Sequence, residues 1–469
     1  MIVGKGSRFP FLFFSCLITA CSSFTAGNLF SHYSLQNKAL YQSVRAGDYP
    51  GAEAFLPDAV GGDILANMEK GRVSFLNAHD ARSREYLEQS ERAVREQQEL
   101  AVISISETAT DIGALAINDN LTSYTPGDYE LGFLHLYLAL SYLKGNDLEG
   151  ALVEIKKANQ VQEQARKKRE EQLSQAESAL KKRGISPNLG AVLAQYPDAG
   201  QSLQAVQSGY LLYLSALLYE AAGELNSAYV DYRRALAVVP DNRQVIQGTI
   251  RVAEKLDVGD DLARLYLRYG HQHAENDKKG QIIVLDEQSI VATRQGWTLS
   301  LPFFSGGGVA LHSLSLPYYP FRAEEKFPLL RLNGTALTQS LLTDVNLMAQ
   351  QDLTERIPMM VTRLVLRVIA KEQLRRGAAQ ESDSTGNVLL NVWNMLTEQP
   401  DTRSWQTLPA KVYSSSHYLL PGEYSLELGG FTAENRSYNV KIKAGETVFV
   451  WLSRQGSHCT VWHKQLGGL

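Results

Sequence analysis

The spacing of apolar residues changes character near residue 275. From about residue 28 to 270, apolar positions recur every three or four residues, with Gly, Asn and Pro between the runs, which is typical of successive amphipathic helices. After about residue 280, short runs alternate apolar and polar positions between Pro and Gly boundaries, which predicts strands. The pattern therefore predicts a multidomain α+β protein that begins with an α-helical solenoid.

The clearest helical unit spans residues 209–240. Small and aromatic residues alternate on two facing helices around a turn at Gly223, and Pro240 ends the unit. Ala216 and Ala228 allow two antiparallel helices to approach closely, while Tyr219 and Tyr232 fill the space beside them. These spacings resemble the tetratricopeptide repeat.

Further copies of this unit are predicted upstream. A second good copy covers about 131–161 around the Gly145-Asn146-Asp147 turn, and weaker copies surround Gly47 and the Ala78-His79-Asp80 turn. The expected number of repeats is three to five, within a helical domain of residues 21–275. An insertion at about 154–205 begins with a long polar helix, over 154–183, that we expect to project from the array.

The second half of the chain is predicted to contain two regions. The region 280–400 holds strands over 281–285, 297–304 and 309–316, followed by a helix over 341–376 that Pro358 kinks or splits. The region 401–469 holds strands over 410–419, 424–428, 438–442 and 448–453. Its turns, at Pro421-Gly422 and Gly445, resemble those of small antiparallel β-sandwich modules on secreted proteins.

The amino terminus has the parts of a secretory signal. Lys5 and Arg8 precede an apolar run over 9–20, which is shorter than the roughly 20 residues that a membrane-spanning helix needs. The run ends in Ile18-Thr19-Ala20-Cys21, which resembles the lipobox of bacterial lipoproteins. The resemblance implies that residues 1–20 are removed and that Cys21 is acylated. Ser22 in place of Asp implies the periplasmic face of the outer membrane.

Composition fits a folded, exported protein. The 469 residues are 44% hydrophobic and 20% charged, with a net charge of −4 and no concentrated basic surface that would indicate nucleic-acid binding. Of the three cysteines, Cys16 lies in the leader and Cys21 is the expected lipidation site. Cys459 is therefore expected to be a buried free thiol.

The chain carries no strong enzymatic motif. A P-loop, His-Glu-x-x-His, Gly-x-Ser-x-Gly and a dinucleotide glycine pattern are all absent, which weakens an enzyme hypothesis. The run 306–308 is better interpreted as a hairpin loop than as an anion cradle. Zinc binding by His458, Cys459 and His463 lacks a fourth ligand. We expect no catalysis, metal or cofactor.

The most concentrated remaining feature is Asp401-Thr402-Arg403-Ser404-Trp405, followed by Leu408-Pro409. With Arg363 and Arg367 on one face of the preceding helix, it resembles an uncharacterised family of Gram-negative periplasmic lipoproteins, to which no activity is assigned. From the residues alone, we expect Asp401 to pair with Arg363 or Arg367 above a packed Trp405. A structural latch is favoured over a ligand site made by Arg363, Arg367, Asp401, Arg403 and Trp405.

The leading functional hypothesis is a non-catalytic adaptor that binds another envelope protein through its helical repeats. Tyr142 and Tyr213 are the candidate contact residues, because Tyr219 and Tyr232 are better explained as repeat core. Peptidoglycan-synthesis and export machineries are both plausible sources of the partner. The alternative is a glycan-binding or hydrolytic C-terminal region that uses Asp401, Glu423 and Glu427.

Overall fold

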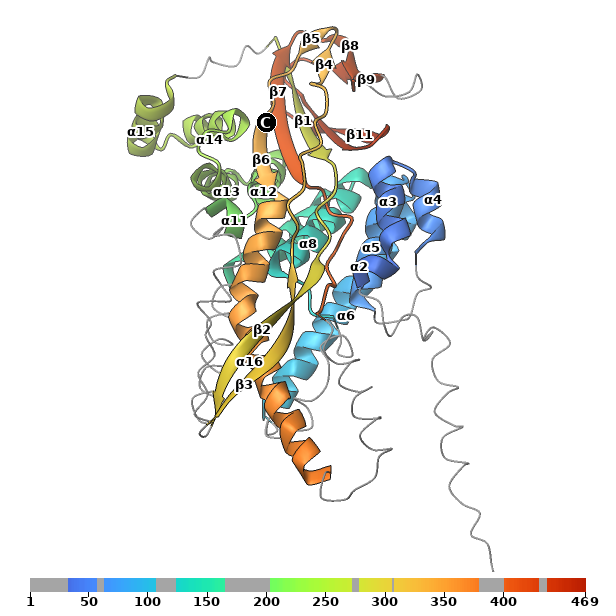
Figure 1. The fold of residues 1–469 in the computed structure, drawn as a ribbon. Helices are drawn as coiled ribbons and strands as arrows, with labels where there is room; N and C mark the ends of the chain where they lie inside the picture. The colour runs from blue at the N-terminus through green and yellow to red at the C-terminus, as the bar shows by residue number, and fades with distance from the viewer. Residues whose placement is uncertain are drawn as a thin grey trace, which may run out of the picture.

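The protein is built in three layers, in which helices cover one face of a five-stranded sheet and a four-stranded sheet covers the other (Figure 1). The computed structural model describes residues 33–56, 63–106, 124–164, 203–271, 278–305, 308–378, 400–429 and 437–469. The leader, Cys21 and most of the expected projecting helix lie outside these ranges. No helix within them is long and apolar enough to cross a membrane.

The helical layer precedes the strands in the chain, and one long helix follows within the sheet region. An unlabelled helix covers 148–164. The labelled helices are α2 (Tyr33–Gln36), α3 (Lys38–Ala46), α4 (Tyr49–Ala54), α5 (Ile64–Leu76), α6 (Asp80–Ser106), α8 (Asp128–Lys144), α11 (Leu203–Val206), α12 (Gly209–Ala221), α13 (Leu225–Val238), α14 (Arg243–Leu256), α15 (Gly259–Tyr269) and α16 (Val345–Ala378).

Helix pairs occur where the sequence predicts them. Gly223 joins α12 to α13 at φ +78°, a conformation that glycine adopts without strain. Ala228 and Tyr232 are fully buried at this crossing. The turn at Asn146 and the turn at Ala78 also have positive φ, at 66° and 58°. The pairs α5–α6 and α8 with 148–164 are therefore confirmed as helical hairpins.

Strands from both predicted C-terminal regions interleave. The central sheet has the order β11-β10-β1-β7-β6, with β1 and β10 parallel and the other neighbours antiparallel, and the second sheet has the order β5-β4-β8-β9. The strands are β1 (Gly280–Gln288), β2 (Gln295–Ser305), β3 (Gly308–Tyr318), β4 (Arg331–Leu332), β5 (Thr335–Ala336), β6 (Ser340–Asp344), β7 (Lys411–Leu419), β8 (Gly422–Glu427), β9 (Ser437–Ile442), β10 (Thr447–Gln455) and β11 (His458–Gly467).

The predicted boundary between 280–400 and a separate β-sandwich of 401–469 is therefore wrong. Strand β1 lies between β10 and β7, and it is apolar on both faces. Ile282 and Val284 pack toward the four-stranded sheet, whereas Ile283 and Leu285 pack toward the helices. A strand that is apolar on both faces belongs in the middle of a covered sheet. Here its two neighbours, β7 and β10, come from residues 411–455, so the two predicted regions form one sheet.

The hairpin and the long helix of this half also differ in detail from expectation. Strands β2 and β3 pair as a hairpin up to Ser305 and Gly308, as predicted. The expected helix over 341–376 begins later, at Val345, because residues 340–344 form β6. Helix α16 continues through Pro358. One apolar stripe runs along α16 on both sides of Pro358 and is buried against the rest of the structure. Its fully or nearly fully buried members are Leu353, Ile357, Val361 and Val365.

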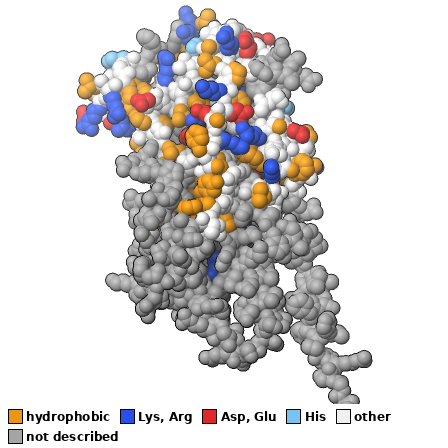
Figure 2. All heavy atoms as spheres, viewed as in Figure 1, with side chains coloured by type: hydrophobic (Ala, Val, Ile, Leu, Met, Phe, Trp, Pro, Cys, Tyr) orange, Lys and Arg blue, Asp and Glu red, His pale blue; other side chains and the backbone are white. Residues whose placement is uncertain are grey.

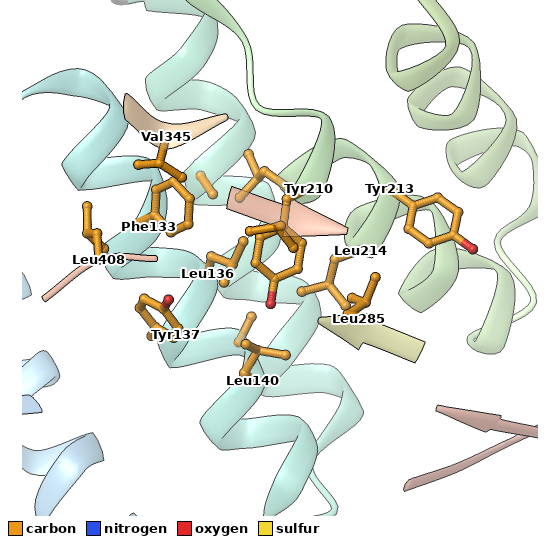
Figure 3. Close-up of a cluster of buried hydrophobic side chains, with 14 of the residues drawn as sticks. Phe133, Leu136, Tyr137, Leu140, Tyr210, Tyr213, Leu214, Leu285, Val345 and Leu408 are labelled. Atoms are coloured by element: carbon orange, nitrogen blue, oxygen red, sulfur yellow. The ribbon is translucent and has the colours of Figure 1, made fainter. Parts of the chain in front are cut away.

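The main core lies between the helices and the central sheet. Figure 3 shows Phe133, Leu136, Tyr137 and Leu140 of α8 facing Tyr210 and Leu214 of α12, with Leu285 of β1 beside them. Every one of these side chains is buried. The helical array and the sheet thus share one hydrophobic core.

Candidate functional site

A buried carboxylate marks the point where the layers meet. Glu287 on β1 is fully buried and accepts from Arg72 Nη2 of α5 at 2.6 Å. Tyr137 of α8, Tyr210 of α12 and the Trp451 indole of β10 each donate to the same carboxylate at 3.1 Å. Arg72 and Glu287 are both removed from water, which is unfavourable for two charges. The additional hydrogen bonds to Glu287 offset part of that cost. We call this cluster the ionic centre.

The neighbouring acid on β1 binds on the opposite face. Asp286 forms an ion pair with Arg454 of β10, whose Nη1 also donates to the Pro328 carbonyl at 2.7 Å. Successive side chains of a strand point to opposite faces, so Asp286 and Glu287 stabilise two different interfaces. Strand β1 is thereby tied to the helices and to the four-stranded sheet.

The segment 401–409, called here the latch segment, is held by acids from two N-terminal helices. Glu130 of α8 accepts from the Trp405 amide at 2.7 Å. Glu69 of α5 accepts from the Gln406 amide and from the Thr407 hydroxyl, both at 2.6 Å. Trp405 is fully buried and meets the Tyr137 ring edge-on at 5.9 Å between centroids. These bonds tie the segment to α8 and α5, and its role as a structural latch stays a prediction.

The expected partner of Asp401 is replaced by another arginine. Asp401 binds Arg403, two residues along the same segment, at 2.9 Å. Arg363 is exposed on α16, and Arg367 is buried on the same helix. Asp401 Oδ1 also accepts from the Arg403 amide at 3.0 Å, and this local turn places the guanidinium beside the carboxylate. The latch thus binds α5 and α8 rather than the expected arginines of α16.

Glu69 makes the latch sensitive to pH. Burial raises the pKa of its carboxyl from 4.5 to about 7, although the bonds from Thr407 and Gln406 oppose the shift. Between about pH 4.5 and pH 7, the Glu69 carboxyl keeps its proton in the folded protein, whereas it loses that proton in the unfolded chain. Its contribution to stability is therefore full below about pH 4.5 and is lost as the pH rises through about 7.

Glu69→Gln is expected to remove this dependence, because the amide is neutral and retains an acceptor for the Gln406 amide. Between pH 5 and pH 8, the unfolding free energy of the unmodified chain should fall relative to that of the variant by on the order of 3 kcal/mol. Urea unfolding of the unacylated proteins at both pH values measures the difference. If the unfolding free energies of the two proteins change with pH in parallel, a group other than Glu69 is responsible for the pH dependence.

The two tyrosines proposed as partner contacts lie in different surroundings. Tyr213 is only 2% exposed and packs edge-on against Tyr232 at 6.0 Å, so its assignment to the surface is wrong. Burial raises its pKa well above the usual range. Tyr142 is partly buried and donates to Glu88 at 3.1 Å. A contact between Tyr142 and a partner stays a prediction.

Cys459 is a buried thiol, as predicted, and burial raises its pKa. It lies on β11, where His458 points to the opposite face, while the His463 imidazole is 2.7 Å from the Tyr438 hydroxyl. These three side chains do not converge. Within the ranges that the structure describes, no group of three His, Cys, Asp or Glu residues is arranged to hold a metal ion.

Two open grooves meet at Arg322, and Figure 2 shows charged and apolar side chains interspersed on the described part of one face. The mixed groove has a volume of about 430 Å³ and is lined by residues that include Gln288, Phe321, Arg322, Glu324, Asp344 and Lys411. The cationic groove has a volume of about 470 Å³ and is lined by residues that include Leu35, Lys38, Gln42, Arg45, Gln295 and Arg322.

The sequence did not predict either groove, because the walls of each come from segments that are far apart in the chain. The spacing of Lys38, Gln42 and Arg45 on one helical face was the available signal.

Comparison with known proteins assigns no family. No family model matches the chain, and no curated protein matches it. One solved structure, described as "Crystal structure of MamA protein", is 10% identical and aligns with a TM-score of 0.29, covering 53% of this chain and 100% of that one. This similarity is too low to assign a fold or a function to this chain.

Proposed function

We propose that this chain is a non-catalytic adaptor, anchored by a lipid on Cys21 to the periplasmic face of the outer membrane. The supporting observation is that paired helices share a core with the central sheet, while the described part of the chain leaves their outer faces exposed. Figure 1 shows α13, α14 and α15 to one side of the central sheet. Successive helix pairs of this kind form extended surfaces for protein partners.

The uncovered faces carry apolar side chains. On α13, an outward stripe contains Asn226, Val230, Arg233 and Ala237, and Val230 is 56% exposed. On α15, Leu267 is 90% exposed. A helix or an extended segment of an envelope protein that packs on α13 and α15 would remove these side chains from water.

The acids nominated for the alternative, a hydrolase or glycan-binding site, do not meet. Asp401 is bound by Arg403, and Glu427 accepts from the Gly334 amide at 2.8 Å. Glu423 faces Lys441 across the β8–β9 pair. None of the three lines the mixed or the cationic groove. The adaptor proposal is therefore better supported than chemistry at these residues.

Site-specific photocrosslinking in intact cells tests the partner surface. A photoreactive residue at Val230 or Leu267 is expected to capture a defined envelope protein. The same residue at Lys441, which is exposed on the four-stranded sheet, is the matched control and should capture none. Capture from Lys441 alone would contradict the proposal and move the working surface to the sheets.

Cys21→Ala is expected to release the protein from the membrane, because a single thiol carries the whole proposed anchor. Fractionation of cells after metabolic labelling with a fatty acid measures acylation and membrane attachment together. Ser22→Ala is the matched control and should stay acylated. A Cys21→Ala protein that still incorporates label would refute the anchor.

A further inference from the structure

The cationic groove has two walls that carry positive charge. Lys38 and Arg45 lie on one face of α3, seven residues apart, which separates them by about 10 Å along the helix axis. Arg322 stands on the other wall, beside the beginning of β2. Gln42 and Gln295 line the same groove and add amide groups to it. The groove thus offers both charge and hydrogen-bond donors to an anion.

The three cations of this groove, Lys38, Arg45 and Arg322, form no ion pair within the part of the chain that the structure describes. None of the described residues that line the groove is Asp or Glu. Arg322 donates to the Tyr41 hydroxyl. Partial burial lowers the pKa of Arg322, and nearby Glu325 only partly opposes this effect.

The acids around the adjoining mixed groove already have partners. Glu325 accepts from the Ser289 hydroxyl at 2.9 Å. Lys411 binds Glu324 at 2.6 Å and Asp344 at 3.6 Å. Glu324 and Asp344 are thus paired with Lys411, whereas Glu325 lies near Arg322 without forming an ion pair with it. The excess of positive charge is therefore local to Lys38, Arg45 and Arg322.

Two exposed apolar side chains accompany the cations. Leu35 is 59% exposed and lines the cationic groove, and Phe321, next to Arg322, is 98% exposed. Apolar side chains beside Lys and Arg are typical of surfaces that lie at a membrane interface. An acidic peptide would use the charges but would not account for both apolar side chains.

We infer that the cationic groove binds the phosphodiester headgroup of an anionic phospholipid. Lys38 and Arg45 contact the phosphate region from one side and Arg322 contacts it from the other, while Leu35 and Phe321 enter the boundary with the acyl chains. This site would hold the protein against the membrane in one orientation. The inference does not require the lipid on Cys21, so it is testable without an anchor.

The test uses the mature chain with Cys21→Ser, which cannot be acylated, and co-sedimentation with vesicles. Binding to vesicles of phosphatidylcholine with 30% phosphatidylglycerol should exceed binding to phosphatidylcholine alone, and it should weaken with salt. The triple variant Lys38→Gln, Arg45→Gln, Arg322→Gln should bind at least tenfold more weakly, since each cation near an anionic surface contributes about a factor of five. A second variant, Phe321→Ser, should weaken binding without changing the charge.

A charge-matched control removes the same number of cations elsewhere. Its exposed positions are Lys156, Arg264 and Lys441, each changed to Gln. Equal loss in the control and in the groove variant would overturn the inference, because only net charge would then matter. Glycerol phosphate tests whether the groove binds a free phosphate. If glycerol phosphate binds in the groove and vesicles do not bind, the inference is also overturned. Tighter groove-dependent binding of a poly-glutamate peptide would reassign the site to an acidic protein segment.

Discussion

Glu287→Leu is expected to destabilise the protein by several kcal/mol, because it breaks the buried ion pair of the ionic centre. The substitution leaves Arg72 buried with an uncompensated charge and removes the acceptor of Tyr137, Tyr210 and Trp451. Breaking one side of a buried ion pair costs about 3–5 kcal/mol, which is a large part of the stability of an ordinary protein. Urea unfolding of the unacylated chain measures the loss.

A double variant separates charge from packing in the ionic centre. Arg72→Met with Glu287→Leu removes both charges, so it should be less destabilised than Glu287→Leu alone. Arg363→Met is the matched control, because Arg363 is exposed on α16 and its loss should change stability by less than about 0.5 kcal/mol. A double variant that is the least stable of the three would contradict the account of the ionic centre.

Ala228→Trp is the second substitution with a large expected effect. Ala228 is fully buried where α13 crosses α12, and an indole there would force the two helices apart. Overpacking of a core typically costs about 1–3 kcal/mol and sometimes more. The neighbouring crossing is equally tight, since a Cβ at Gly248 would lie 2.3 Å from the Tyr232 ring. The thermal midpoint of the unacylated chain should fall by several degrees.

Ala237→Trp supplies the control for that experiment. Ala237 lies on the same helix but is exposed, so the same side chain should leave the midpoint nearly unchanged. If both variants melt at the same temperature, α12 and α13 do not cross as described. A lower thermal midpoint for Ala228→Trp, with an unchanged midpoint for Ala237→Trp, would support close packing of α12 against α13.

The helical hairpins were predictable because their signals are local. Gly223, Asn146 and Ala78 each turn the chain between two periodic segments, and each has positive φ in the structure. The strands were also found, since their alternation and boundaries are local too. Their order was not, because β1 pairs with β10, whose first residue, Thr447, pairs with Gln281. Pairing over such a separation leaves no trace in either segment alone.

The misplacement of Tyr213 was avoidable. Helix α12 has the sequence GYLLYLSALLYEA, which is apolar almost all round. A helix of that kind is buried over most of its surface, so Tyr210 and Tyr213 belong to the core, while Tyr219 near its end is partly buried. The partners of the latch segment were beyond sequence reasoning. Glu69 and Glu130 look like ordinary solvent-facing helix acids until the fold buries them beneath Gln406 and Trp405.

The contacts of the latch segment and of the ionic centre join an early helix to strands that are synthesised much later. Glu69, Arg72 and Leu76 of α5 bind groups that are made much later than α5, and these include Thr407, Ser453 and Thr460. A chain that emerges amino terminus first must therefore keep the charged face of α5 uncovered until β10 and β11 have appeared. During that interval the apolar side chains of α5 stay exposed to water, and the arrival of β10 and β11 ends the exposure.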